Sequence, residues 1–328
     1  MDIVYLIEEG TLTGIANAVR GKTGGADELS LKDMIVAING LEFKDKAAGI
    51  VDGSATEYSN DKIESISSCV FQYHNGLISV GFPSCKTIGS SAFSNCANLK
   101  YVSFPACTTI SASAFILCKS LTGADFAKCS VVGSNAFEYC YNLENANFPV
   151  CHTVNSCALR YCSSLTSISF PNATLVSNYA FQGCVSLTNA YLPSCTSLNL
   201  GQFAICTNLE TASFPACTVI GNYVFSGCSN LKSVSLPMCT SIGASAFDKC
   251  YNLTSISLPK CTTLASYAFN KCSNLVSVYL TGSSVCTLAH SRAFSSASKA
   301  IIYVPSSLVS SYKTATNWTV FSNRIYGI

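Results

Sequence analysis

A strict 22-residue period runs through most of this sequence and constrains its fold more than any other feature. Prolines, phenylalanines and leucines all recur at this step. The prolines are Pro83, Pro105, Pro149, Pro171, Pro193, Pro215, Pro237 and Pro259. The leucines run without a gap through ten copies, from Leu77 to Leu275. Copies that stay in register over this length predict a structure built by stacking one small unit.

One copy, residues 231–253, indicates what each unit contains. Residues 234–236 alternate between apolar and polar side chains, as a strand with one buried face does, and Pro237 ends the strand. Residues 240–242 predict a second, shorter extended piece. Residues 246–253 carry apolar side chains at spacings of three and four, which predicts a short helical turn.

A single copy is too small to bury its apolar side chains, whereas stacked copies bury them in a continuous core. We therefore expect an α/β solenoid in which short strands and short helical turns repeat. The composition agrees with this expectation, because 49% of the residues are hydrophobic and only 11% are charged. A thin core that is copied many times produces such a bias.

Seventeen of the twenty cysteines belong to the period and form two columns, which begin at Cys85 and Cys96. Cys69, Cys157 and Cys286 fall outside both columns. Cysteine packs as a small hydrophobe, so the sequence favours buried free thiols. Disulfides between stacked coils remain an alternative, because neighbouring strands lie at distances that a disulfide spans. A metal site is a weaker alternative, since the clustered spacing of zinc ligands is missing.

The repeat L-x-x-V-x-F/L-P-x-C-x-x-I-G-x-x-A-F-x-x-C-x-x-L resembles the BspA-like leucine-rich repeats over about residues 61–305. The resemblance implies a right-handed leucine-rich-repeat solenoid. It also implies an adhesive or binding role, because members of this family are mostly surface or secreted proteins of bacteria and some protists. It does not imply an enzyme.

Two helices are expected ahead of the repeats, since residues 11–19 and 30–38 place apolar side chains at helical spacing. We assign residues 1–42 to an N-terminal helical attachment segment and residues 43–60 to a connector with a first cap strand. Residues 11–34 are similar to the short leader segments of phage and prophage tail-associated proteins of Firmicutes. This resemblance implies that the segment attaches to other tail or virion proteins.

The period breaks near the other end of the chain, because Phe294 follows Phe269 after 25 residues. A last strand is expected around residues 302–304, which completes the solenoid at residue 305. Residues 306–328 are expected to form a C-terminal cap. Apolar residues at helical spacing and the lone Trp318 predict a capping helix over the end of the solenoid, as such stacks require.

Charge and hydropathy exclude several classes of function. The net charge of +2 gives no electrostatic case for binding nucleic acid or anionic lipid. The mean hydropathy is +0.35, but no apolar run approaches the ~18 residues of a membrane span, so membrane insertion is not expected. Residues 1–9 lack the features of a secretory signal peptide.

No motif predicts catalysis or a cofactor, because carboxylates are sparse and no phosphate-binding loop occurs. His152 lies beside Cys151 and near Cys157, which leaves a Cys–His site as an alternative to a filled repeat position. A threonine column that begins at Thr108 is either a structural ladder or an array that binds ice or glycans. We expect a protein that is not an enzyme.

The outward positions of the first strand are the candidate ligand-binding surface. Tyrosine, serine, asparagine and glycine dominate them, as in adaptable binding surfaces. The candidate residues are Tyr101, Asp125, Asn145, Asn147, Asn189, Tyr191 and Tyr279. A plain solvated sheet face is the alternative, and it accounts for the serines better than for the tyrosines. A second tyrosine cluster falls in the loops, at Tyr139, Tyr141 and Tyr161, with Tyr251 farther on.

These observations predict a non-enzymatic binding protein. The leading hypothesis is a phage or prophage tail-associated receptor-binding protein, located on the virion or outside the cell. Its repeat surface would recognise a host-cell surface polysaccharide or protein, because the surface carries few charges. The alternatives are a bacterial cell-surface adhesin of the same family and an intracellular protein-interaction scaffold. The oligomeric state stays open, since nothing indicates a coiled coil.

Overall fold

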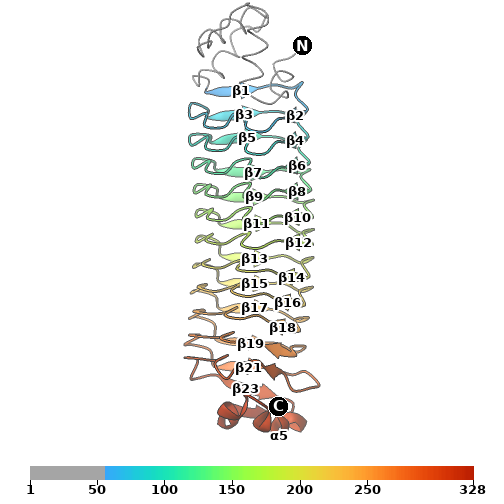
Figure 1. Cartoon of the computed structure of the whole chain (residues 1–328), viewed down its shortest axis with the longest axis vertical. Coiled ribbons are helices and arrows are strands. Elements are labelled where there is room, and N and C mark those ends of the chain that lie inside the picture. Colours follow the sequence, from blue (N-terminus) through green and yellow to red (C-terminus); the bar gives the residue numbers. More distant parts are fainter. Residues whose placement is uncertain (1–55) are drawn as a thin grey trace, which may run out of the picture.

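The computed structural model describes residues 56–328, which form one solenoid of stacked coils (Figure 1). Each coil contributes a long strand, a short strand and a turn segment that leads to the next coil. The helices expected within residues 11–38 and the attachment segment assigned to residues 1–42 lie outside the described residues. No helix within residues 56–328 has the length and apolarity needed to cross a membrane.

The long strands stack in chain order along one side of the solenoid, which we call the long-strand face (Figure 1). Most adjacent strands pair in parallel and in register, for example Val80 opposite Val102, and the pairs form four separate sheets along this face. The three-residue strands are β1 Glu57–Ser59, β3 Ser79–Gly81, β5 Tyr101–Ser103, β7 Gly123–Asp125, β9 Asn145–Asn147, β11 Ser167–Ser169, β13 Asn189–Tyr191, β15 Thr211–Ser213, β17 Ser233–Ser235, β19 Ser255–Ser257 and β21 Ser277–Tyr279. They confirm the strand that the alternating residues predict.

The short strands form a second parallel ladder beside the first, as the sequence predicts (Figure 1). Ile88 lies opposite Ile110, and the β-branched side chain of each points into the core. The two-residue strands are β2 Ser65–Ile66, β4 Thr87–Ile88, β6 Thr109–Ile110, β8 Val131–Val132, β10 Thr153–Val154, β12 Leu175–Val176, β14 Ser197–Leu198, β16 Val219–Ile220, β18 Ser241–Ile242, β20 Thr263–Leu264 and β22 Thr287–Leu288.

The predicted helical turns are wrong, so the described part is mostly strand and turn rather than α/β. In the coil of residues 243–253, Ser245 and Lys249 adopt left-handed φ angles of 54° and 61°. Two such residues prevent a run of right-handed helical residues. The backbone N–H of Phe247 instead donates to the carbonyl oxygen of Ala268 in the next coil, at 2.8 Å.

This pattern recurs in the turn segments between residues 69 and 271, and we call the resulting side of the molecule the turn edge. Alternate N–H groups donate to the next coil, while those between them donate to a carbonyl three residues back, as Asp248 does to Ser245 at 3.1 Å. The turn segment is therefore a third set of inter-coil hydrogen bonds. Its apolar side chains still point inward at the spacing that the sequence shows.

The core repeats the same contacts from coil to coil. Phe115 stacks on Phe93 and Phe137, with ring centroids 5.1 and 5.2 Å away. The second cysteine column links the coils, because the Cys140 thiol donates to the carbonyl oxygen of Phe115 at 3.1 Å. The first column bonds within its own coil, as the Cys129 thiol does to the carbonyl oxygen of Val131 at 3.2 Å.

The predicted C-terminal cap is present. Strand β23, Ile301–Val304, is followed by the 3-10 helices η1, Ser306–Leu308, and η2, Thr319–Arg324, with the helix α5, Val309–Thr314, between them. Trp318 is fully buried, and its Nε1 donates to the carbonyl oxygen of Cys286 at 2.7 Å. A final strand, β24 Ile325–Gly327, pairs in parallel with β23, and the sequence did not predict it.

Candidate functional site

The long-strand face carries all seven residues that the sequence singled out. The first and third residues of each long strand point outward, because side chains alternate along a strand, while the middle residue faces the core. Tyr101 opens β5 and is 55% exposed, and Tyr191 closes β13 and is 58% exposed. Rigid coils therefore present large tyrosine rings to solvent.

Three successive coils of this face hold a small polar group. Asp125 closes β7 and Asn147 closes β9, directly opposite each other. The Asn147 Nδ2 donates to an Asp125 carboxylate oxygen at 2.9 Å. In the next pair of strands, the Ser167 hydroxyl donates to Oδ1 of Asn145 at 3.3 Å. The fold brings Asp125, Asn145 and Asn147 together, as one cluster of exposed hydrogen-bonding groups.

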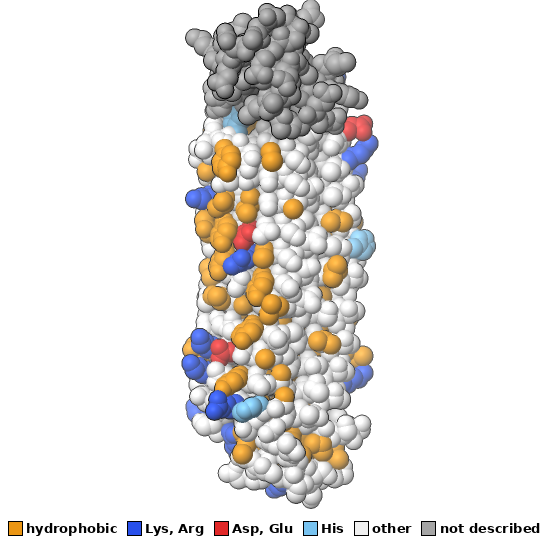
Figure 2. Space-filling model, viewed as in Figure 1, with side chains coloured by type: hydrophobic (Ala, Val, Ile, Leu, Met, Phe, Trp, Pro, Cys, Tyr) orange, Lys and Arg blue, Asp and Glu red, His pale blue; other side chains and the backbone are white. Residues whose placement is uncertain are grey.

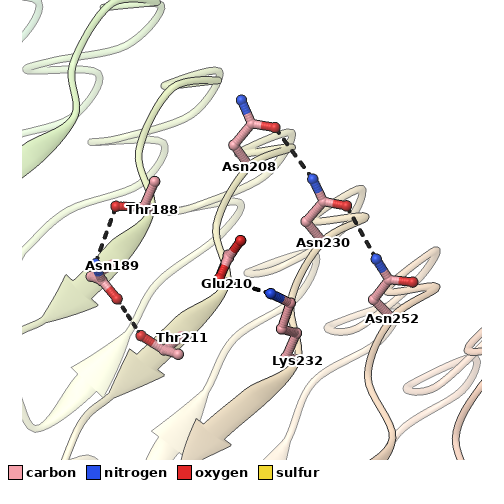
Figure 3. Close-up of polar contacts among 8 residues, drawn as sticks. All are labelled: Thr188, Asn189, Asn208, Glu210, Thr211, Asn230, Lys232 and Asn252. Atoms are coloured by element: carbon pink, nitrogen blue, oxygen red, sulfur yellow. Dashed lines mark hydrogen bonds and ion pairs between the residues drawn. The ribbon is translucent and has the colours of Figure 1, made fainter.

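A second polar group surrounds Asn189, the first residue of β13 (Figure 3). Its Nδ2 donates to the Thr188 hydroxyl at 3.1 Å, and its Oδ1 accepts a hydrogen bond from the hydroxyl of Thr211 in the next coil. These bonds orient the Asn189 amide next to the exposed Tyr191. Together they form a fixed polar and aromatic pair.

Side-chain ladders continue this group towards the C-terminus, just before the long strands (Figure 3). Nδ2 of Asn230 donates to Oδ1 of Asn208 at 3.3 Å, and Nδ2 of Asn252 donates to Oδ1 of Asn230 at 3.1 Å. Beside them, Lys232 and Glu210 form an exposed ion pair at 2.8 Å. Sequence reasoning missed these residues, although their 22-residue spacing was the available signal.

The remaining candidates lie apart from these groups. Tyr101 is near the N-terminal end of the face, where the Lys100 ammonium lies 5.2 Å from its ring centroid. Tyr279 is near the other end and stacks on Tyr303, with centroids 5.0 Å apart and planes 15° from parallel. The sequence did not single out Tyr303, because the step from Tyr279 is 24 residues rather than 22. The seven residues therefore line one face without forming one pocket.

The loop tyrosines lie on the turn edge. Tyr139 stacks on Tyr161 with centroids 5.3 Å apart, and Tyr141 lies tilted against Tyr139 at 5.9 Å. Nη1 of Arg160 pairs with the Glu138 carboxylate at 3.2 Å, and the guanidinium lies 4.9 Å from the Tyr161 ring centroid. The Glu138 side chain is almost fully buried, so this ion pair fixes the loop.

Cysteine chemistry does not define a site. All twenty cysteines lie within the described residues and are free thiols. Burial raises the pKa of Cys96 to about 12 and that of Cys151 to about 11. Since the thiolate is the nucleophile and the metal ligand, these thiols are inert at neutral pH. His152 is exposed, and residues 56–328 hold no group of three or more His, Cys, Asp or Glu side chains placed to bind a metal.

The geometry defines a leucine-rich-repeat solenoid, a class of scaffold that typically binds other molecules along its repeated surface. Residues 56–156, 130–217 and 196–319 match the family described as the BspA type leucine rich repeat region. The matches span most of the chain, so this protein belongs to the BspA type leucine-rich-repeat family. They begin at residue 56 and give no support to the phage-tail resemblance of residues 11–34.

Several solved structures are similar to this chain. A leucine-rich cell surface protein of Faecalibacterium prausnitzii is 19% identical, covering 76% of this chain and 87% of its own, with a TM-score of 0.42. A leucine-rich-repeat protein of Bacteroides ovatus is 20% identical, covering 83% and 92%, with a TM-score of 0.42. That of T. pallidum is 22% identical, covering 55% and 79%, with a TM-score of 0.40. A search of curated proteins found no match.

Proposed function

We propose that this chain is a non-enzymatic binding protein that recognises a macromolecule on a cell surface through its long-strand face. The family supports a binding or adhesive role in general terms. The observation that carries the proposal is the pair of half-exposed tyrosines, Tyr101 and Tyr191, among the small and mostly polar outward residues of strands β3 to β19. A face that contacts only water would gain nothing from exposed aromatic rings.

The physical case rests on how the face is built. Tyrosine supplies a large contact area with little conformational freedom to lose, and asparagine and serine supply adaptable hydrogen bonds. The parallel ladders hold these side chains in place before a partner arrives, which lowers the entropic cost of binding. Charged side chains are few and scattered over the visible surface (Figure 2). A largely neutral partner surface suits this composition.

A double substitution, Tyr101→Ala with Tyr191→Ala, tests the proposal. We expect the fluorescently labelled variant to lose at least about tenfold in binding to intact Firmicutes cells, because aromatic anchors dominate such interfaces. Tyr251→Ala is the matched control, since Tyr251 is also exposed, at 41%, but lies in a turn rather than on a long strand. Equal binding by the double variant and the control would remove the long-strand face from consideration.

We propose further that the chain is carried by a phage or prophage tail, with residues 1–42 attaching it to other tail proteins. This idea rests on the resemblance of residues 11–34. After prophage induction, an antibody against the chain should detect it in purified virions. Detection on uninduced cells instead would favour the bacterial surface adhesin. Retention inside the cell, with no binding to any cells, would favour the intracellular scaffold.

A further inference from the structure

The turn edge carries tyrosines in a backbone conformation that tyrosine disfavours. Their φ angles lie between 58° and 63°, in the left-handed region, where a Cβ atom crowds the backbone. Glycine and asparagine occupy such positions more easily. The tyrosines are Tyr73, Tyr139, Tyr161, Tyr179, Tyr223 and Tyr267. The same two positions are left-handed in nearly every coil, so the hydrogen bonds of the turn segment hold this conformation whatever the residue type.

Three of these tyrosines form a row in which the ring returns at every second coil. Tyr179, Tyr223 and Tyr267 follow one another at 44 residues, and small residues, Gly201 and Ser245, take the same position in the coils between. Neighbouring strands of a sheet lie about 4.8 Å apart, so the rings recur about every 10 Å along the solenoid.

The small residues make room for the rings. Gly201 has a φ of +58°, and an ideal Cβ added there would lie 2.5 Å from Cε1 of Tyr179. The Tyr179 ring therefore covers the Cα atom of Gly201, and a larger side chain at that position would displace it. Tyr161 covers Gly183 in the same way, with Cε1 at 2.6 Å from the ideal Cβ. At Gly183 and Gly201 the absence of a side chain is therefore what lets the preceding tyrosine ring lie flat on the next coil.

The first two rings of the row are left without an aromatic partner. Core phenylalanines stack coil upon coil, but within residues 56–328 Tyr179 and Tyr223 stack on no other aromatic ring. Tyr223 is 49% exposed, whereas Tyr179 and Tyr267 are partly buried. Tyr267 also differs because its ring stacks on His290, with centroids 6.5 Å apart, and its hydroxyl accepts a hydrogen bond from Nη1 of Arg292 at 2.7 Å. Hydrophobic side chains gather in a stripe along one side of the solenoid (Figure 2).

Charge is sparse at the start of the row, because between Arg160 and Lys232 the sequence contains a single charged residue, Glu210. The turn segments farther along carry Asp248, Lys249 and Lys271. Glu210 precedes β15 and pairs with Lys232 there, away from the turn segment. The surface around Tyr179 is therefore complementary to an uncharged ligand, and the regular spacing of the three rings is complementary to a ligand that itself repeats.

We propose that Tyr179, Tyr223 and Tyr267 bind a linear neutral polysaccharide that runs along the turn edge. The C–H bonds on one face of a pyranose ring carry partial positive charge and stack on the negative face of an aromatic ring. A polymer engages successive tyrosines at once, so its contacts reinforce one another. This site is separate from the long-strand face and does not depend on the function proposed for it.

Affinity electrophoresis of the full chain tests this site. Native gels would contain hydroxyethylcellulose, glucomannan, galactomannan or dextran, and retardation would report binding. At least one of these neutral polymers should retard the wild-type chain. The double variant Tyr179→Asn with Tyr223→Asn should bind about tenfold more weakly, because asparagine tolerates the left-handed conformation but offers no ring. Tyr179→Phe with Tyr223→Phe should retain most of the binding.

Controls separate this site from the proposed function. Tyr101→Ala with Tyr191→Ala should leave retardation unchanged while weakening cell binding. Failure of all four polymers to retard the wild-type chain would overturn the proposal, as would equal retardation of the wild type and the asparagine variant. A change in the monomer–dimer equilibrium of that variant by sedimentation, without any change in retardation, would show that the row contacts a second copy of the chain instead.

Discussion

The interior and the outer surface of the same coils follow different rules. Inside, each column keeps one residue type or a close apolar substitute, so that Phe115 meets nearly the same neighbours as Phe137. Outside, the residue type changes from coil to coil, as between Tyr101 and the Gly123 that lies next along the face. The interior therefore determines stacking and stability, and the outer positions are left free to determine recognition. The predictions below test whether this division holds.

The largest effect should come from alkaline pH acting on the interior thiols. Burial raises the pKa of Cys96 to about 12, and those of Cys151 and Cys195 to about 11. The unfolded chain loses these protons at lower pH than the folded chain does. The stabilisation that comes from keeping these thiols protonated is therefore fully present below the thiol pKa of the unfolded chain. It is lost as the pH rises through the thiol pKa values of the folded chain. Each such thiol removes about 1.4 kcal/mol per pH unit in that window.

Urea unfolding between pH 7.5 and 10.5, with reductant present throughout, measures this slope. Several buried thiols should together remove several kcal/mol between pH 8 and 10. Cys96→Ala should make the free energy of unfolding depend less steeply on pH, by the contribution of one thiol. Cys69→Ser should leave it unchanged, because Cys69 is exposed. A free energy of unfolding that is constant up to pH 10 would show that the thiols do not stay protonated in the folded state.

A single core ring should matter far more than a single surface ring. Phe115→Ala removes a fully buried ring that is stacked on both sides, and we expect it to lower the free energy of unfolding by about 3–5 kcal/mol. Tyr191→Ala should change it by less than about 0.5 kcal/mol. Circular dichroism during urea unfolding would measure both. Comparable losses would mean that the long-strand tyrosines are structural.

The two ion pairs, Arg160–Glu138 and Lys232–Glu210, allow a smaller comparison. Arg160→Met leaves the nearly buried Glu138 carboxylate without its cationic partner, so the free energy of unfolding should fall by about 2 kcal/mol. Lys232→Met breaks a pair that is exposed on both sides and should change stability by less than about 0.5 kcal/mol. Thermal melts of both variants at low and high salt would check the difference, which should persist in salt.

The asparagine ladder should contribute least. Asn230 bonds to Asn208 and Asn252 near the long-strand face, but solvent competes for these amides. Asn230→Ala should therefore lower the free energy of unfolding by about 0.5 kcal/mol. A loss of more than about 2 kcal/mol in the free energy of unfolding would mean that the asparagine ladder determines stability, as the core columns do. The same urea series would measure it.

The sequence predicts the strands and the core well because both follow the period. Each core column is filled by apolar or cysteine residues, and the short ladder through Ile242 follows from its β-branched side chains. The helical turn is wrong because spacings of three and four also suit a turn segment with two left-handed residues. Serine and lysine as residue types do not predict the positive φ angles that Ser245 and Lys249 adopt.

The candidate site was predicted only in part, for a similar reason. Alternation along the strands shows that Tyr101 and Tyr191 point outward, so their exposure follows from the pattern. Tyr303 joins Tyr279 only because an insertion lengthens one step, and the fixed period hides that pairing. The row through Tyr179 depends on backbone conformation and on the absence of a side chain at Gly201. The 44-residue spacing of the row is visible in the sequence, but the left-handed backbone and the packing of the Tyr179 ring on Gly201 are not.

Because the register between coils is uniform, the number of coils can change without altering the contacts between neighbouring coils. Every internal coil presents the same set of donors and acceptors to the coil before it and the coil after it. Removing one 22-residue unit from the middle would join two surfaces that already match, while β23, α5 and Trp318 would still seal the end. Duplication of whole units can therefore extend the reach of the protein without redesigning its core.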